Sequence, residues 1–305
     1  MRAFPLCIFF VLTTAAFAAD KTLVLIAGNP SHNAGDHEHR AGCLLFQKCL
    51  TGVPGLKTVV YSGGWPTIQR DGATVDDNAA LEGADAIVIY SDGGGNHPAL
   101  VRDHLEVLRR LMKRGVGFGC IHYATEPTKE KGETEFLDWI GGAFETDWSV
   151  NPLWQAEFKT MPVHPVTRGV KPFATEDEWY FHLRFRPKMK GVTPILTTVA
   201  PASTMERPDG DHSGNPAARS AVAQGEPQIV MWVTERKDGG RGFGFTGGHT
   251  HANWKNEDQR KLVLNALLWV ARIPVPTTGV VSVVSEADLT ANLDQKRSSP
   301  KLSAP

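Results

Sequence analysis

Histidine recurs in three glycine-rich parts of this sequence. It occurs within residues 32–39, at His122 directly after the run 117–121, and at His249 and His251. Neutral imidazole binds Zn²⁺ and other first-row divalent metals, and it also exchanges protons near neutral pH. The histidines together therefore predict either a divalent-metal centre or an acid–base pair. Because the sequence has no short-spaced ligand motif such as HExxH, the fold must bring distant loops together to build either site.

Short apolar runs alternate with amphipathic helix patterns along most of the chain. Strand patterns occupy residues 22–27, 57–61, 84–90, 117–121, 154–159, 194–199, 228–233 and 241–246, and another opens at 179–181. Helix patterns occupy residues 41–50, 98–113, 136–140 and 256–271. This alternation predicts an α/β fold in which a doubly wound, mostly parallel sheet is flanked by helices.

The histidine-bearing loops all follow predicted strands of this sheet. Right-handed crossovers place such loops at one edge, beyond the carboxyl ends of the strands, where α/β proteins bind their ligands. We therefore expect His122 and His249 to be catalytic. We expect the metal ligands, if a metal is bound, to come from His32, His37, His122, His249 and His251.

Each of these histidines also has a structural interpretation. His122 and His249 could instead be bonded to backbone carbonyls, and His251 could face solvent. Next to them, His39 is expected to be solvated, and Asp36 is expected to cap the helix that follows. Glu38 is either a ligand or an acid favoured by the dipole of that helix.

Composition excludes several classes of partner and cofactor. The net charge is −1, with 32 basic and 33 acidic residues, which gives no electrostatic case for nucleic acid or an anionic membrane. The run 92–96 lacks the Lys-Ser/Thr of a P-loop and the spacing of a dinucleotide site, so we expect no nucleotide cofactor. Cys43, Cys49 and Cys120 are too few and too poorly spaced for a disulfide framework.

The two ends of the sequence differ from its middle. Residues 1–18 have the basic start, apolar core and small-x-small ending of a signal peptide, so we expect a periplasmic or secreted protein with no membrane segment after cleavage. Residues 20–276 form the predicted single domain, and the polar residues 277–305 are expected to be a disordered tail. Within the domain, residues 200–225 are predicted to be a long surface excursion.

Four motifs in this order resemble the ThuA-like (trehalose-utilisation) family. They are Gly28 with the His-rich loop after it, the stretch 115–124, Asp177-Glu178-Trp179-Tyr180, and Gly247-Gly248-His249. The resemblance covers roughly residues 21–276. It implies a class I glutamine amidotransferase-like, flavodoxin-like fold. It also adds Glu178 to His122 and His249 as a catalytic residue, because only the family pattern distinguishes Glu178 from a surface acid.

The true glutamine amidotransferases carry a nucleophilic cysteine on the turn after the central strand. In this sequence His122 is similar in position to that cysteine, His249 to the catalytic histidine, and His251 to its acidic partner. Cys120 lies two residues earlier, inside the predicted strand, where burial raises a thiol pKa and makes it inert. Cysteine-dependent glutaminase chemistry is therefore not expected.

The signal peptide predicts export, and the resemblance implies a protein of carbohydrate metabolism that acts on a sugar, keto-sugar or glycoside. Its His-lined site would use a divalent metal such as Zn²⁺, or His122 and His249 as an acid–base pair. Its partner would be a small-molecule carbohydrate, and the reaction would be hydrolysis, elimination or isomerisation. The alternative is a non-catalytic carbohydrate-binding or scaffold protein whose amidotransferase triad has decayed. Five tryptophans near the site loops would either stack on sugar or pack in the core: Trp65, Trp148, Trp154, Trp179 and Trp254.

Overall fold

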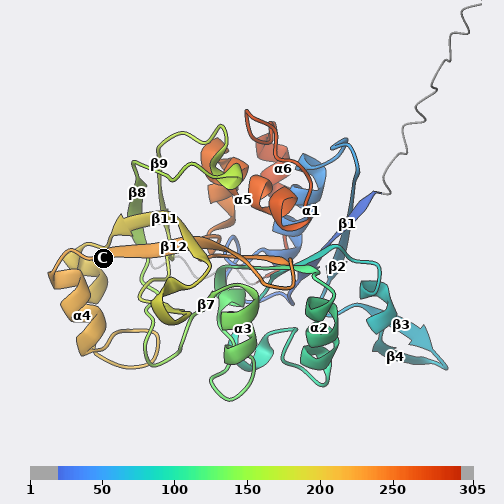
Figure 1. The fold of residues 1–305 in the computed structure, drawn as a ribbon, viewed down its shortest axis with the longest axis horizontal. Helices are drawn as coiled ribbons and strands as arrows, with labels where there is room; N and C mark the ends of the chain where they lie inside the picture. Colours follow the sequence, from blue (N-terminus) through green and yellow to red (C-terminus); the bar gives the residue numbers. More distant parts are fainter. Residues whose placement is uncertain (1–19, 297–305) are drawn as a thin grey trace, which may run out of the picture.

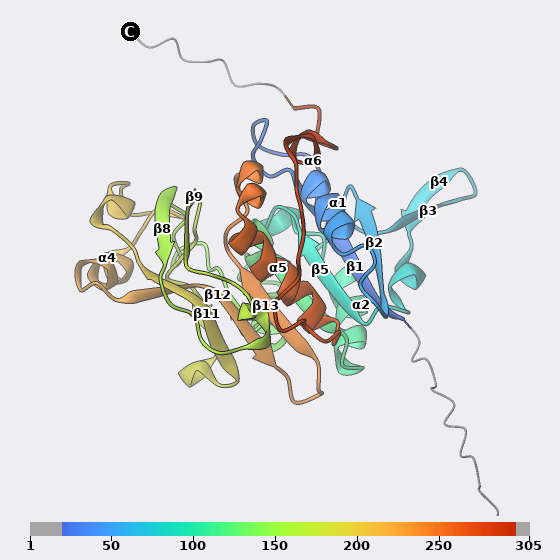
Figure 2. The ribbon, with the colours of Figure 1, turned by 90° about the horizontal axis from the view of Figure 1, so that it is seen from above.

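A seven-stranded sheet lies at the centre of the computed structural model, which describes residues 20–296 (Figures 1 and 2). Its strands, in spatial order, are β11 (Val192–Val199), β12 (Pro227–Glu235), β13 (Arg241–Phe245), β6 (Gly117–Ile121), β5 (Ala86–Tyr90), β1 (Lys21–Ala27) and β2 (Leu56–Ser62). The five strands from β13 to β2 are parallel, whereas β12 is antiparallel to both of its neighbours. The predicted mostly parallel sheet is confirmed.

The central strands are apolar because helices cover both of their faces. Every residue of β5 and β6 is buried, and so are the last five residues of β1. Figure 1 shows α1 (His39–Cys49), α5 (Glu257–Val270) and α6 (Glu286–Thr290) on one face of the sheet. The other face carries α2 (His104–Lys113) and α3 (Glu133–Trp139). Continuous apolar runs are typical of parallel strands enclosed in this way.

Three small two-stranded antiparallel sheets accompany the main sheet. They are β3 (Thr67–Arg70) with β4 (Ala73–Asp76), β7 (Gly142–Ala143) with β10 (Arg184–Phe185), and β8 (Trp154–Phe158) with β9 (Phe173–Asp177). In β8 and β9 buried and exposed residues alternate, which is the pattern of a strand with one solvated face. No helix among residues 20–296 has the length and apolar character needed to cross a bilayer.

The middle of the chain differs from the sequence prediction in three places. No strand opens at 179–181, because β9 ends at Asp177 and only Phe181 forms a single bridge, to Val150. The helix expected from residue 98 begins at His104, after a series of turns. The surface excursion 200–225 contains α4 (Pro216–Ala223), whose N-terminus is capped by the Asn215 side chain.

The expectation of a disordered tail from residue 277 is wrong for residues 277–296. Helix α6 begins with a capping box formed by Ser285 and Asp288, and Leu289 is buried against the core. The segment is polar, yet a few buried contacts are enough to hold it on the domain. Residues 297–305 and the predicted signal peptide, 1–18, lie outside the described residues.

The three cysteines and most of the tryptophans considered above pack in the interior of the protein. Cys43 and Cys120 are buried, Cys49 is partly buried, and all three are free, as the sequence predicted. Burial raises the pKa of the Cys120 thiol well above its ordinary value, which agrees with an inert residue. Of the five tryptophans considered for sugar stacking, all except Trp148 are buried.

Gly117 is required where β6 passes under α5. A Cβ atom at this position would lie 2.3 Å from the backbone oxygen of Val270, and a backbone atom cannot move aside. Replacing Gly117 by Ala should therefore lower the free energy of unfolding by about 1–3 kcal/mol, as measured by urea denaturation. Gly83→Ala is the matched control, because a Cβ there meets no atom within 4 Å. An equal loss of stability in both variants would contradict this interpretation.

Candidate functional site

Neighbouring strands of the sheet deliver the site residues in spatial order. His249 follows β13, His122 follows β6, Asp92 follows β5, and His37 lies in the loop after β1. Glu178 comes from outside the main sheet, immediately after β9. The carboxyl ends of parallel strands therefore meet at one edge and carry the predicted residues toward one point.

The backbone at two of these positions is held in the left-handed region. His122 has φ 58° and His37 has φ 48°. Such a conformation costs a residue with a side chain about 1–3 kcal/mol and persists only where the surrounding structure enforces it. At His122 it turns the chain sharply from β6 into the short helix His122–Thr125, so the ring leaves the strand and points into the site.

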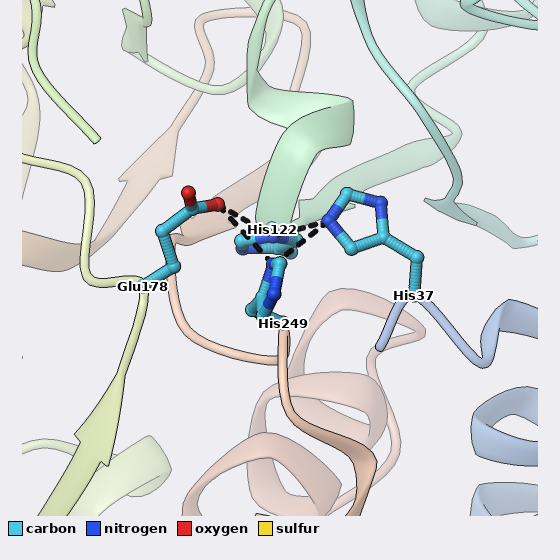
Figure 3. Close-up of side chains that lie close together, drawn as sticks. All are labelled: His37, His122, Glu178 and His249. Carbon is cyan, nitrogen blue, oxygen red and sulfur yellow. Dashed lines mark hydrogen bonds and ion pairs between the residues drawn. The ribbon is translucent and has the colours of Figure 1, made fainter. Parts of the chain in front are cut away.

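Four side chains converge in this site (Figure 3). His37 Nε2 lies 3.0 Å from His122 Nε2 and 3.0 Å from His249 Nδ1. Glu178 Oε2 lies 3.2 Å from His249 Nδ1 and 3.6 Å from His122 Nε2. A tetrahedral Zn²⁺ with bonds of about 2.0–2.1 Å places its ligand atoms about 3.3–3.4 Å apart. The separations of the four donor atoms bracket that value.

Hydrogen bonds on the far sides of two rings fix which nitrogen carries the proton. His122 Nδ1 donates to the Thr246 carbonyl at 2.8 Å, and His37 Nδ1 donates to the Asp92 carboxylate at 2.8 Å. In the neutral rings both Nε2 atoms therefore carry lone pairs, and these face each other across 3.0 Å. Two facing lone pairs repel, so the arrangement is suited to a cation between them.

Protonation of these rings is opposed by their surroundings. Burial lowers the pKa of His122 well below its ordinary value, and the neighbouring His37 and His249 lower it further. Burial and the adjacent histidines likewise lower the pKa of His37. His249 differs: burial lowers its pKa, but the hydrogen bond and charge of Glu178 outweigh this and raise it overall. The site thus holds two neutral imidazoles ready to donate lone pairs.

The four residues are not equally accessible. The side chains of His37 and His122 are 1% and 0% exposed, whereas those of Glu178 and His249 are 21% and 17% exposed. A small molecule can therefore reach the cluster from the side of Glu178 and His249.

Asp177 organises the two loops that form this open side. Its buried carboxylate accepts hydrogen bonds from the backbone N–H groups of Gly248 at 2.8 Å, Thr250 at 3.1 Å and Glu178 at 2.9 Å. The loop that carries His249 and the turn that carries Glu178 are thereby tied to one anchor. The sequence motif contained Asp177, but nothing in the sequence distinguished its role from that of its neighbour.

The remaining predicted ligands lie outside the four-residue group. His32 stacks on His37 with ring centroids 3.6 Å apart, and together with Asp92 these form a second group of potential donors. His251 is buried, and neither of its ring nitrogens has a hydrogen-bond partner among the described residues. It does not share the side of His249, because a short helix begins at His251 and the extended alternation ends there.

Two expectations for the first histidine loop are wrong. His39, the first residue of α1, is buried rather than solvated, because its ring packs edge-on against the buried ring of Tyr90, and burial lowers its pKa to about 4. Asp36 does not cap α1, whose N-cap position is Glu38. Asp36 instead pairs with Thr250 through a β-bridge, and its carboxylate lies 3.6 Å from His249 Nε2.

Tyr180 is a site residue to which the sequence analysis gave no role. Its hydroxyl lies 3.1 Å from His122 Nε2. Burial and the charge of Glu178 raise the pKa of Tyr180 well above its ordinary value, so the hydroxyl stays protonated. It is a hydrogen-bond donor beside the four converging atoms.

A second histidine–carboxylate pair lies near the cluster and was also missed. His212 Nε2 donates to both carboxylate oxygens of Glu126 at 3.0 Å, and Thr146 donates to the same carboxylate at 2.8 Å. The His212 ring stacks on Phe144 and meets the ring of Tyr123 edge-on. His212 lies within the excursion 200–225, where its surroundings give no sequence pattern that would identify it.

The His212–Glu126 pair should make the stability of the fold depend on pH. The hydrogen bond to Glu126 raises the pKa of His212 despite partial burial, and Glu178 is among the charges that add to this rise. The pair should therefore stabilise the fold below the unfolded-state pKa of about 6.5, and this contribution should be lost as pH rises through the higher folded value. Glu126→Gln should lower the His212 pKa in an NMR titration of ¹³C-labelled histidine. An unshifted His212 titration in the variant would refute the assignment.

Comparison with known proteins agrees with this architecture. The fold is similar to that of a ThuA-like protein from Bacteroides uniformis, with a TM-score of 0.55 and 15% identity over 86% of this chain and 95% of the other. A ThuA-like protein from Parabacteroides merdae is also similar, with a TM-score of 0.55 and 14% identity over 88% of this chain and 94% of the other. No curated protein matches the sequence. The family model for ThuA, described as trehalose utilisation, matches residues 36–270, and the chain therefore belongs to the ThuA family.

Proposed function

We propose that this protein is a metal-dependent enzyme that acts on a small-molecule carbohydrate. His37, His122, His249 and Glu178 would hold the divalent cation, and Zn²⁺ fits a set of three imidazoles and one carboxylate. The observation that carries the proposal is the convergence of four donor atoms, which lie 3.0–3.6 Å from one another in the pairs described above. Two of these atoms, His37 Nε2 and His122 Nε2, point their lone pairs at each other. The family description, trehalose utilisation, supports a sugar as the substrate.

The surroundings of the cluster suit an oxygen-rich substrate. A divalent cation in this position would polarise a sugar oxygen by accepting it as a further ligand. A keto-sugar offers a carbonyl and hydroxyl oxygens, and a glycoside offers hydroxyl and glycosidic oxygens. The Tyr180 hydroxyl, 3.1 Å from His122 Nε2, would donate a hydrogen bond to an oxygen bound there. The sugar would enter on the side of Glu178 and His249, which is the exposed side of the group.

His212 and Glu126 would supply proton transfer in this proposal. Glu126 accepts the Nε2 proton of His212, which leaves Nδ1 as the reactive nitrogen of an oriented base. The His212 side chain is 28% exposed, so a substrate can reach it. A cation that polarises the sugar and a nearby base that accepts a proton are common to hydrolysis, elimination and isomerisation. Export, which was predicted from residues 1–18, stays a prediction.

Metal content is the first test of the proposal. Protein stripped with a chelator and dialysed against Zn²⁺ should retain about one Zn²⁺ per chain by elemental analysis. His122→Ala should lose most of this metal, because it removes a buried donor. His32→Ala is the matched control: it deletes a neighbouring histidine outside the four-residue group and should retain the metal. Equal retention in His122→Ala and the wild type would refute the proposed site.

Turnover distinguishes the enzyme from a sugar-binding protein. Metal-loaded protein would be incubated with trehalose, methyl α- and β-glucosides and their keto derivatives, and the products followed by NMR. We expect at least one keto-sugar or glycoside to be converted, and we expect chelation or His122→Ala to slow this at least 100-fold. Binding of these sugars without conversion would favour the non-catalytic alternative.

The Asp92 carboxylate should control metal affinity without touching the metal. It orients His37 through the 2.8 Å hydrogen bond to Nδ1, and loss of such an outer partner typically weakens binding about 10–100-fold. Asp92→Ala should show this loss in a competition titration with a chromophoric chelator. Ser31→Ala is the control, because the Ser31 hydroxyl donates to the same Asp92 oxygen but contacts none of the four donors. An unchanged affinity in Asp92→Ala would refute the role of this hydrogen bond in orienting a metal ligand.

A further inference from the structure

The chain beyond the family match packs against the loop that carries His37. We define residues 285–296 as the C-terminal strap; the family model ends at residue 270. Helix α6 of the strap contacts α1 and the short helix that follows His249. Its last described residue, Lys296, reaches the backbone of residues 36 and 37. The strap therefore touches two loops that deliver histidines to the cluster.

The strap is joined to this loop by a buried ion pair. Lys296 Nζ lies 3.2 Å from Glu38 Oε1, and the two side chains are only 4% and 1% exposed. Glu38 also accepts the backbone N–H of Asp294 at 2.8 Å and that of Gly35 at 3.0 Å. Neither interpretation of Glu38 offered by the sequence, a ligand or a first-turn acid, describes this role. Glu38 links the strap to the loop in front of α1.

The same contacts hold the backbone of His37. Lys296 Nζ donates to the carbonyl oxygens of Asp36 and His37, the second at 3.1 Å. The His37 N–H donates to the His249 carbonyl at 2.9 Å. His37 is thus fixed on both sides while its φ of 48° is unfavourable for a residue with a side chain. Without the strap, one side of this strained residue would lose its charged partner.

We propose that Lys296 and Glu38 are positioning residues that hold His37 in its ligand orientation, so that the C-terminal strap completes the metal site. This inference rests on the proposed function for its metal readout. A buried ion pair that loses one member leaves the other charge uncompensated, so the loop must rearrange to solvate Glu38. The rearranged segment is the one that aims His37 Nε2 at the cluster.

The test compares two lysines of the full-length protein whose ion pairs both join the strap to the rest of the domain. Lys296→Met removes the buried pair, whereas Lys48→Met removes an exposed pair between α1 and Asp288 of α6. Lys296→Met should weaken Zn²⁺ binding about 10-fold or more. It should also speed amide hydrogen exchange in residues 33–39 of the metal-free protein. Lys48→Met should change neither, and Lys296→Arg should restore much of the affinity by keeping the charge.

Several outcomes would overturn the inference. Wild-type affinity and wild-type exchange in Lys296→Met would show that the strap does not position His37. An equal affinity loss in Lys48→Met would mean that the strap acts only through general stability. If the wild-type protein binds no Zn²⁺, the proposed function fails, and the exchange of residues 33–39 alone decides whether Lys296 holds the loop.

Discussion

Two ring nitrogens that carry lone pairs, His37 Nε2 and His122 Nε2, face each other across 3.0 Å in a buried site. Neutral imidazoles left alone would turn away from such a contact. They do not turn here, because the Nδ1 atom of each ring is hydrogen-bonded: that of His37 to the Asp92 carboxylate and that of His122 to the Thr246 carbonyl. Much of the surrounding structure enforces this contact, from the sheet order to the strained backbone at both histidines.

The contact also explains why an amidotransferase-like fold need not carry thiol chemistry. In this chain the turn after the central strand β6 has φ 58° at its first residue, and that residue is His122 and not a cysteine. The cysteine two residues earlier is buried within β6, where its pKa is raised. A sharp turn presents whichever side chain occupies it. An imidazole at such a turn offers a lone pair where a thiol would offer a nucleophile.

The sequence predicted this fold well because its strands are continuous apolar runs and its histidines follow them directly. It placed His122, His249 and His37 on one edge by the rule for parallel sheets. It failed where side-chain position depends on local backbone turns: His251 does not join His249 in the group, and His39 is buried rather than solvated. Glu178 needed a family pattern, because an acid after an edge hairpin has no distinctive signal. Lys296 and Glu38 could not be paired, since 258 positions separate them without any periodicity.

The unequal exposure of the four donor side chains gives the site a closed end and an open end. His37 and His122 lie at the closed end, where burial keeps them neutral, whereas Glu178 and His249 lie at the open end. The ring of His212 meets the ring of Tyr123 edge-on, and Tyr123 in turn meets the ring of His37, so the second pair lies beside the cluster. A ligand held between them would meet lone-pair donors on one side and an oriented imidazole on the other. Because both loops at the open end are tied to Asp177, entry of a ligand need not disturb the closed end.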